Sequence, residues 1–184
     1  LNFSIDVESI GSAILYTCKE HINAASAVLF LLINEEEASL YFNISSGYPD
    51  KINISFDIKD GFCNYLLGKK RVLKIDELRE NCKDAINIKK LEELNCEICV
   101  PLIVKEKISG ILIIGQTKTI LKYQEEDWEF LSALINMATV ALENSYLHTL
   151  SITDGLTKAY LRRYFLFRME EEIKYSLDAL SSSD

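Results

Sequence analysis

Two cysteines three residues apart have the spacing of a metal or redox site. Cys96 and Cys99 form a C-x-x-C pair, which occurs in zinc sites and in thiol–disulfide exchange. A zinc site needs four ligands, and no second cysteine or histidine pair completes one. The pair leads into the apolar run 98–104, where strand geometry would turn the two thiols to opposite faces of a sheet. We therefore expect structural cysteines and no metal.

The other cysteines and the histidines give no stronger signal of chemistry. The chain has five cysteines, an odd number, and no basic-then-apolar leader opens the sequence. This predicts reduced thiols, no disulfide and a cytoplasmic location. The two histidines, His21 and His148, are not adjacent to any cysteine, so a covalently attached tetrapyrrole is disfavoured.

Composition excludes several classes of partner. With 184 residues, 48% hydrophobic and 26% charged, the chain can form about one to one and a half domains. The net charge of −8 repels phosphate backbones, so we expect no nucleic-acid partner. The longest apolar runs, 27–33 and 108–114, are shorter than the roughly 18 residues of a membrane span, so we expect no membrane segment here.

Apolar periodicity predicts the elements of the first half. Spacings of three and four between residues 7 and 22 predict a helix with Asp6 as its N-cap. The run 27–33 predicts a buried strand that pairs with 40–44 across a polar turn. The less regular middle contains four predicted elements: an extended segment 52–57, a helix 60–67, a strand 71–75 and a helix 84–94.

The second half predicts a hairpin and one long helix. Strands 98–104 and 108–115 form the hairpin, and Pro101 favours a sheet edge or a local opening because it lacks an N–H donor. From Glu125 a helix of about seven turns carries two apolar stripes, which need two neighbours. We expect its own sheet to cover one stripe and a second subunit the other, giving a homodimer through 7–22 and 125–150.

The order of these elements resembles the GAF fold. That resemblance implies an α+β fold with a GAF-like central antiparallel sheet, terminal helices packed on one face, and a long linker helix at the end. It covers a sensory domain with its signalling helix over residues 1–148. The segments that carry it are 60–76, 100–102, 108–112, 125–131 and 138–144.

The GAF resemblance also implies a pocket between the sheet and residues 55–94, for an unidentified small-molecule ligand. Aromatic residues at such positions belong to a core more often than they contact a ligand, and a domain without ligand that serves as a dimerisation platform stays an alternative. The tentative pocket residues are Phe56, Asp57, Phe62, Cys63 and Tyr65.

Residues 153–165 resemble the opening of a GGDEF domain, the catalytic domain of diguanylate cyclases. An Asp-x-Leu-Thr turn precedes a helix with paired arginines, although Leu161 stands where asparagine is usual. We assign 149–184 as the truncated start of such a domain, and both chain ends suggest a longer protein. The matching residues are Asp154, Leu156, Thr157, Arg162, Arg163 and Phe165.

The resemblance implies a regulatory sensor of a diguanylate cyclase, which joins two GTP molecules into cyclic di-GMP. No Gly-Gly-Asp/Glu-Glu-Phe loop occurs, so no catalytic residue is assigned and no cofactor is expected in this segment. GTP and Mg²⁺ are expected only for the missing cyclase portion. The alternatives are a free methionine sulfoxide reductase that uses cysteines, and a sensor of cyclic nucleotides or tetrapyrroles.

Overall fold

The computed structural model describes residues 2–32, 38–49, 51–119 and 122–152, with side chains between residues 8 and 144. The predicted signalling domain lies almost wholly in these ranges. The GGDEF-like residues lie outside them, namely Asp154, Leu156, Thr157, Arg162, Arg163 and Phe165.

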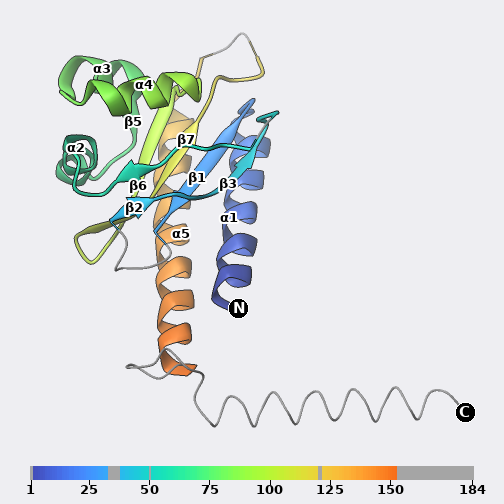
Figure 1. Cartoon of the computed structure of the whole chain (residues 1–184). Helices are drawn as coiled ribbons and strands as arrows, with labels where there is room; N and C mark the ends of the chain where they lie inside the picture. Colours follow the sequence, from blue (N-terminus) through green and yellow to red (C-terminus); the bar gives the residue numbers. More distant parts are fainter. Residues whose placement is uncertain (1, 33–37, 50, 120–121, 153–184) are drawn as a thin grey trace, which may run out of the picture.

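A five-stranded antiparallel sheet forms the centre of the described part, in the order β3-β1-β7-β6-β5 (Figure 1). A separate two-stranded ribbon, β2 with β4, lies beside it. The strands are β1 (Ala27–Leu31), β2 (Ser39–Leu40), β3 (Phe42–Ser46), β4 (Phe56–Asp57), β5 (Leu73–Lys74), β6 (Ile98–Val104) and β7 (Lys107–Ile114).

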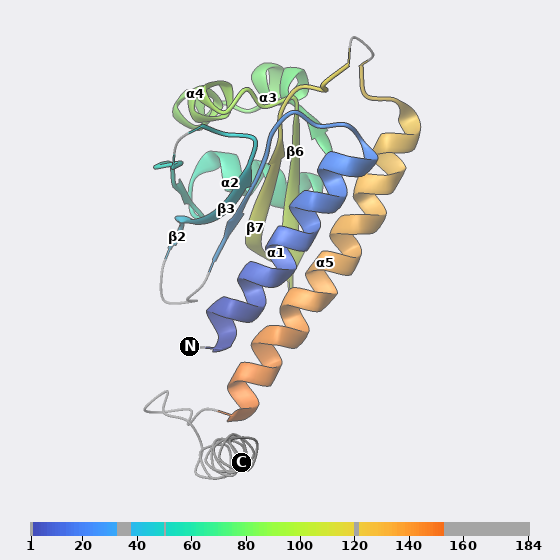
Figure 2. The ribbon, with the colours of Figure 1, turned by 90° about the vertical axis from the view of Figure 1, so that its right-hand side faces the viewer.

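The helices cover the two faces of the sheet unequally. The long helices α1 (Asn2–His21) and α5 (Glu125–Ile152) run side by side over one face, as Figure 2 shows. The short helices α2 (Gly61–Lys69), α3 (Ile75–Asn81) and α4 (Ala85–Glu93) lie on the other. The predicted α+β fold, with terminal helices on one face, is confirmed. Of the helices described, none is long and apolar enough to span a bilayer.

Alternating side chains of the central strands build two hydrophobic cores. In β1, Val28 and Phe30 pack under the short helices, whereas Leu29 and Leu31 pack under the two long ones. A strand that is buried on both faces has no polar face, and every residue of β1 is buried accordingly. This explains why the sequence of β1 is continuously apolar.

Two predicted element boundaries were wrong. Helix α1 begins at Asn2, so Asp6 lies inside the helix and is not its N-cap. An N-cap is worth only about 1 kcal/mol, and residues 2–5 contain no proline or glycine that would stop the helix. The predicted strand partner 40–44 is divided, because β3 pairs with β1 while Leu40 pairs with Phe56 of β4.

Helix α3 was not predicted from the sequence. The predicted strand 71–75 shrinks to β5, because Ile75 already begins α3. Asp76 and Glu77 lie in the first turn of α3, where the helix dipole favours negative charge. Seven helical residues are too few for a clear apolar period, which is why the pattern was missed.

Pro101 lies at a local edge of the sheet, as predicted. The short strand β5 pairs only with Ile98 and Cys99 of β6, so β6 has no strand partner on that side at Pro101. On its other side Pro101 faces Ile111 of β7. A proline, which has no N–H to donate, is tolerated best at such a position, where the strand is paired on one side only.

Candidate functional site

Three of the tentative pocket residues are fully buried in the core. Phe56, Phe62 and Cys63 are solvent-inaccessible and belong to the cluster beneath α2, α3 and α4. The rings of Phe30 and Phe56 meet edge to face at 5.1 Å, and Phe56 and Phe62 are 5.4 Å apart. Aromatic side chains therefore fill the space around these positions, between the sheet and the short helices.

The other two tentative pocket residues lie nearer the surface. Asp57 is exposed, and its Oδ1 accepts a 2.8 Å hydrogen bond from the Lys59 backbone N–H. Tyr65 is half-buried beside an open hollow that Cys82 and Asp84 also border. Its hydroxyl is buried and has no hydrogen-bond partner within the described residues. The structure thus separates Asp57 and Tyr65 from the three core residues.

Four of the five cysteines gather on one side of the sheet, and Cys18 lies in the core on the other side. These four share the cluster beneath the short helices: Cys63, Cys82, Cys96 and Cys99. The prediction that Cys96 and Cys99 face opposite sides was wrong. Cys96 lies before β6 begins at Ile98, so the alternation of a strand does not reach it. Its thiol donates instead to the Ile98 carbonyl, at 3.4 Å.

Burial disfavours the reactive thiolate form of three of these cysteines, Cys63, Cys96 and Cys99. Burial raises the pKa of Cys63 to about 12, and it raises the pKa of Cys96 and of Cys99 well above the usual thiol value. A protonated thiol is a poor nucleophile and a poor metal ligand. All five cysteines are free, and no three His, Cys, Asp or Glu side chains in the described ranges are arranged to hold a metal ion. The geometry therefore disfavours the reductase alternative.

A buried polar network joins the short helices. Asn87 is 1% exposed, and its amide donates to Asp60 Oδ2 at 3.0 Å and to Asp84 Oδ2 at 2.9 Å. Asp84 also accepts from the backbone N–H groups of Asn87 and Phe62, each at 3.1 Å. One carboxylate therefore caps the first turns of both α2 and α4, and Asp60 itself makes no side-chain cap.

Lys90 extends this network to the segment before β4. Its Nζ donates to the Asn87 Oδ1 at 2.8 Å and to the Ser55 carbonyl at 2.7 Å. The ammonium also lies 5.3 Å from the centre of the Phe56 ring. These contacts hold α2, α4 and the Ser55 segment together, so the wall of the region expected to form the pocket is rigidly connected.

Replacing Asp84 with alanine should lower the free energy of unfolding by about 2–3 kcal/mol at neutral pH, since two caps and a buried amide partner are lost. Burial alone would raise the pKa of Asp84, but the hydrogen bonds from Asn87 and Phe62 outweigh it and lower that pKa below 3.8. A lowered folded-state pKa stabilises the fold above the unfolded pKa, and this stabilisation disappears as the pH falls through the folded value.

Urea unfolding of the wild-type chain and Asp84→Ala at neutral and strongly acidic pH measures both effects. The difference in free energy of unfolding between the wild-type chain and Asp84→Ala should be smaller in acid than at neutral pH. Glu93→Ala, at an exposed position of α4, is the matched control and should change stability by less than about 0.5 kcal/mol. A pH-independent difference would contradict the assigned role of the Asp84 charge.

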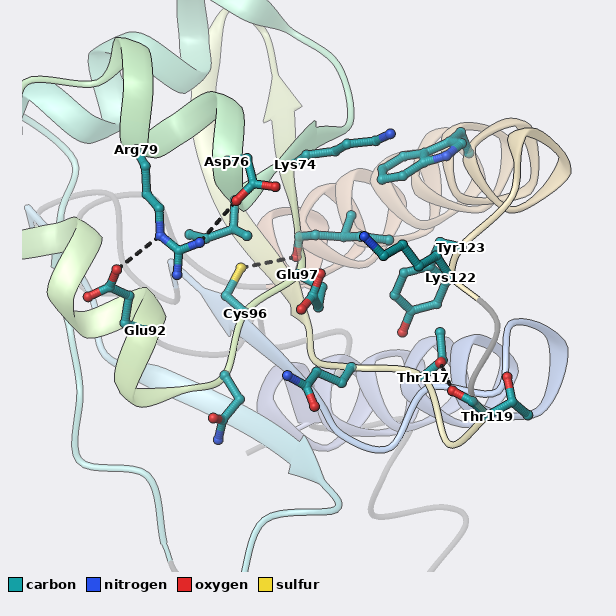
Figure 3. Close-up of a pocket in the computed structure, with 15 residues that line it drawn as sticks. Lys74, Asp76, Arg79, Glu92, Cys96, Glu97, Thr117, Thr119, Lys122 and Tyr123 are labelled. Carbon is teal, nitrogen blue, oxygen red and sulfur yellow. Dashed lines mark hydrogen bonds and ion pairs between the residues drawn. The ribbon is translucent and has the colours of Figure 1, made fainter.

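A cavity of about 590 Å³ opens at the end of the sheet where β6 begins and β7 ends (Figure 3). One wall comes from α3 and α4, and the opposite wall comes from the segment before α5 and from the first turn of α5 itself. None of the tentative pocket residues borders this cavity. Its lining is largely polar and charged, and the Cys96 thiol at its border is protonated, since burial raises its pKa.

Ion pairs fix the first wall of the cavity. The Arg79 guanidinium bonds Asp76 Oδ1 through Nη1 and Glu92 Oε1 through Nε, both at 3.0 Å. The Arg79–Glu92 pair ties α3 to α4, whereas the Arg79–Asp76 pair lies within α3, and dashed lines in Figure 3 mark both. Exposed pairs contribute little stability, but here they satisfy the guanidinium with two carboxylates.

The opposite wall is attached to both the sheet and α5. The Tyr123 hydroxyl donates to the Gly115 carbonyl at 2.7 Å, just beyond β7. In the first turn of α5, the Trp128 ring lies 4.8 Å from the Lys74 ammonium, a cation–π distance. The cavity therefore contacts the start of the long helix. Its arrangement suits binding of a small polar molecule, and its described lining contains no activated nucleophile.

Solved structures with the same fold include sensory modules and parts of signalling proteins. The GAF domain/HD domain protein from Geobacter sulfurreducens has a TM-score of 0.61 and 14% identity, covering 77% of this chain and 95% of that one. The blue-light absorbing form of the PixJ GAF domain from Thermosynechococcus elongatus gives 0.60 and 14%, with 83% and 94% covered. At these identities the likeness concerns the fold alone.

The chain belongs to the GAF domain family, whose model matches residues 4–143. Its sequence is also 25% identical over 178 residues to diguanylate cyclase A of Treponema denticola, an alignment that covers 94% of this chain and 48% of the relative. The chain thus spans about half the length of that relative. Because the alignment covers more of the chain than residues 4–143, it extends beyond the GAF domain.

Proposed function

We propose that this chain is the sensory and dimerisation module of a diguanylate cyclase, and that it controls cyclic di-GMP synthesis through α5. The observation that carries this proposal is the continuity of α5. The helix starts in the GAF core, where Leu131 is fully buried, and ends at Ile152. The next residue, Thr153, opens the segment that resembles a GGDEF domain. A displacement of α5 would therefore move a cyclase domain that follows it directly in the chain.

The cyclase relative supports this proposal, since its alignment extends past the GAF domain. The chain itself lacks the catalytic loop, so GTP and Mg²⁺ would bind only in the rest of the whole protein. A cytoplasmic location, which the five free thiols support, belongs to the same proposal.

Dimerisation through the terminal helices is the second part of the proposal. The inner faces of α1 and α5 are already used: Ile14 and Cys18 of α1 share a core cluster with Leu131 and Ile135 of α5. On the outer face of α5, Met137 is 71% exposed and Val140 is 58% exposed. We call Met137 and Val140 the outer stripe. Large apolar side chains at helical spacing on a surface are typical of an interface.

The double variant Met137→Glu/Val140→Glu should convert a dimer into a monomer. Like charges on paired outer stripes repel and lose apolar contact, so the dimer dissociation constant should rise at least about tenfold, or about 1.4 kcal/mol. Analytical ultracentrifugation of the chain measures this directly. In the whole protein the same variant should lower cyclic di-GMP production from GTP, because two cyclase domains must meet.

Ser132→Glu is the matched control, because it adds a charge at an exposed position of α5 outside the outer stripe. It should leave both association and cyclic di-GMP production unchanged. A wild-type chain that stays monomeric at high micromolar concentration would refute the dimerisation part. A whole protein that makes no cyclic di-GMP would refute the cyclase part.

A further inference from the structure

Three charged side chains that border the cavity of Figure 3 form no ion pair within the described part of the chain. Arg79 is matched by two carboxylates, but neither the Lys74 nor the Lys122 ammonium forms an ion pair there, and the Glu97 carboxylate forms none. In Figure 3, Lys122 is directed toward the side that carries Glu97, whereas Lys74 extends toward α5, where its ammonium lies 4.8 Å from the Trp128 ring. The cavity thus offers two cations and one anion to a ligand.

Glu97 is the most firmly held of the three. Its backbone N–H donates to the Ile114 carbonyl at 2.9 Å, and its carbonyl accepts from the Ile75 N–H at 3.0 Å. The residue is therefore fixed between the end of β7 and the start of α3, and its side chain is half-buried. A partly desolvated carboxylate on a rigid backbone favours a cationic partner.

We propose that this cavity binds a small zwitterion with one carboxylate and one protonated amine, the chemistry of a free α-amino acid. The ligand carboxylate lies against Lys74 and Lys122, and its ammonium lies against Glu97. An anion would leave Glu97 unmatched, and an amine without a carboxylate would leave the two lysines unmatched. The volume of about 590 Å³ is within the range of small-molecule sites.

The position of the cavity gives the ligand a route to α5. Glu97 belongs to the sheet end, whereas Lys122 lies just before α5 and Trp128 lies in its first turn. A ligand that bridges these groups would favour one position of the helix start over another. This regulatory role rests on the proposed function, whereas the binding reaction itself does not. The site also lies apart from the aromatic core between the sheet and α2–α4.

The single tryptophan of the chain supplies a site-specific readout. Trp128 is the only one in the sequence and borders the cavity, so its fluorescence reports occupancy there. The chain is titrated with L-alanine and L-glutamine, and with propionate and ethylamine, which each retain one charge of alanine. Isothermal titration calorimetry supplies the affinities. We expect saturable binding of at least one amino acid, and binding of propionate and ethylamine at least about tenfold weaker than that of alanine.

Two conservative variants separate the two charges of the ligand. Glu97→Gln keeps the shape of the side chain and should weaken amino-acid binding by about tenfold or more, with little effect on propionate. Lys122→Met should weaken both the amino acids and propionate. Glu106→Gln in the β6–β7 turn and Lys107→Met at the start of β7, at the other end of these strands, are the matched controls and should leave binding unchanged.

Several results would overturn the proposal. Propionate or ethylamine could bind as tightly as alanine, or Glu97→Gln could keep the wild-type affinity for amino acids. The third such result is the absence of saturable binding of the common L-amino acids at millimolar concentration. Circular dichroism establishes that each variant is folded before it is titrated. Because binding is measured on this chain without a cyclase domain, its failure is distinct from a failure of the proposed cyclase control.

Discussion

Inserting residues one at a time after Leu150, in the chain extended through its natural cyclase domain, should make cyclic di-GMP production rise and fall with helical phase. Each inserted residue rotates the attached cyclase domain by about 100° and moves it by about 1.5 Å. Leu150 lies in α5, two residues before its end at Ile152. If paired α5 helices set the approach of two cyclase domains, the rotation changes how often those domains meet.

The expected change is large because a switch needs two arrangements of similar free energy. When two arrangements differ by only a few kcal/mol, a modest change in their relative free energy reverses which one predominates. The active fraction then changes by about tenfold or more. The described start of α5 stays anchored through Leu131, so the insertion alters only the chain beyond the insertion point.

A seven-residue insertion is the control for this experiment. Seven residues make about two turns, so phase is nearly restored although length increases. Activity should recover toward the wild-type value. Equal activity in every insertion variant would mean that the GAF domain acts as a tether, and the coupled-helix mechanism would be wrong.

Phe62→Ala should lower the free energy of unfolding by about 3–5 kcal/mol, the usual cost of removing a fully buried aromatic ring. Phe62 is solvent-inaccessible and packs 5.4 Å from the Phe56 ring, ring centre to ring centre. Domains of this size are stable by about 5–15 kcal/mol, so the variant loses a large part of its stability. Urea unfolding followed by circular dichroism measures the change.

Tyr16→Ala is the matched control, since Tyr16 is 69% exposed on α1. It should change the free energy of unfolding by less than about 0.5 kcal/mol. If Phe62→Ala cost no more than Tyr16→Ala, then Phe62 would not be part of a packed core. The interpretation of Phe62 as a pocket residue would then regain support.

The main strands and the long terminal helices were predictable because their signals are local. A strand buried on both faces is continuously apolar, as β1 and most of β6 are, and long helices repeat their apolar period over many turns. The short elements were less predictable. A two-residue strand such as β5 and the seven-residue helix α3 depend on their neighbours more than on their own pattern.

The candidate site was much less predictable than the fold. Phe56, Phe62 and Cys63 were placed in a pocket by family resemblance, and the structure packs them into the core. Asp84 gave no sequence signal beyond the start of a helix, yet it caps two helices. Such a double cap depends on the three-dimensional approach of α2 and α4.

The GAF fold, the order of the main elements and the long final helix that leads to the GGDEF-like segment were predictable from the sequence, because periodicity and short motifs are properties of neighbouring residues. Which side chains share a cavity depends on the three-dimensional packing. Lys74, Glu97 and Lys122 come from segments up to 48 positions apart in the chain. Sheet pairing and helix packing bring these three residues together, and no pattern among neighbouring residues in the sequence predicts that they meet.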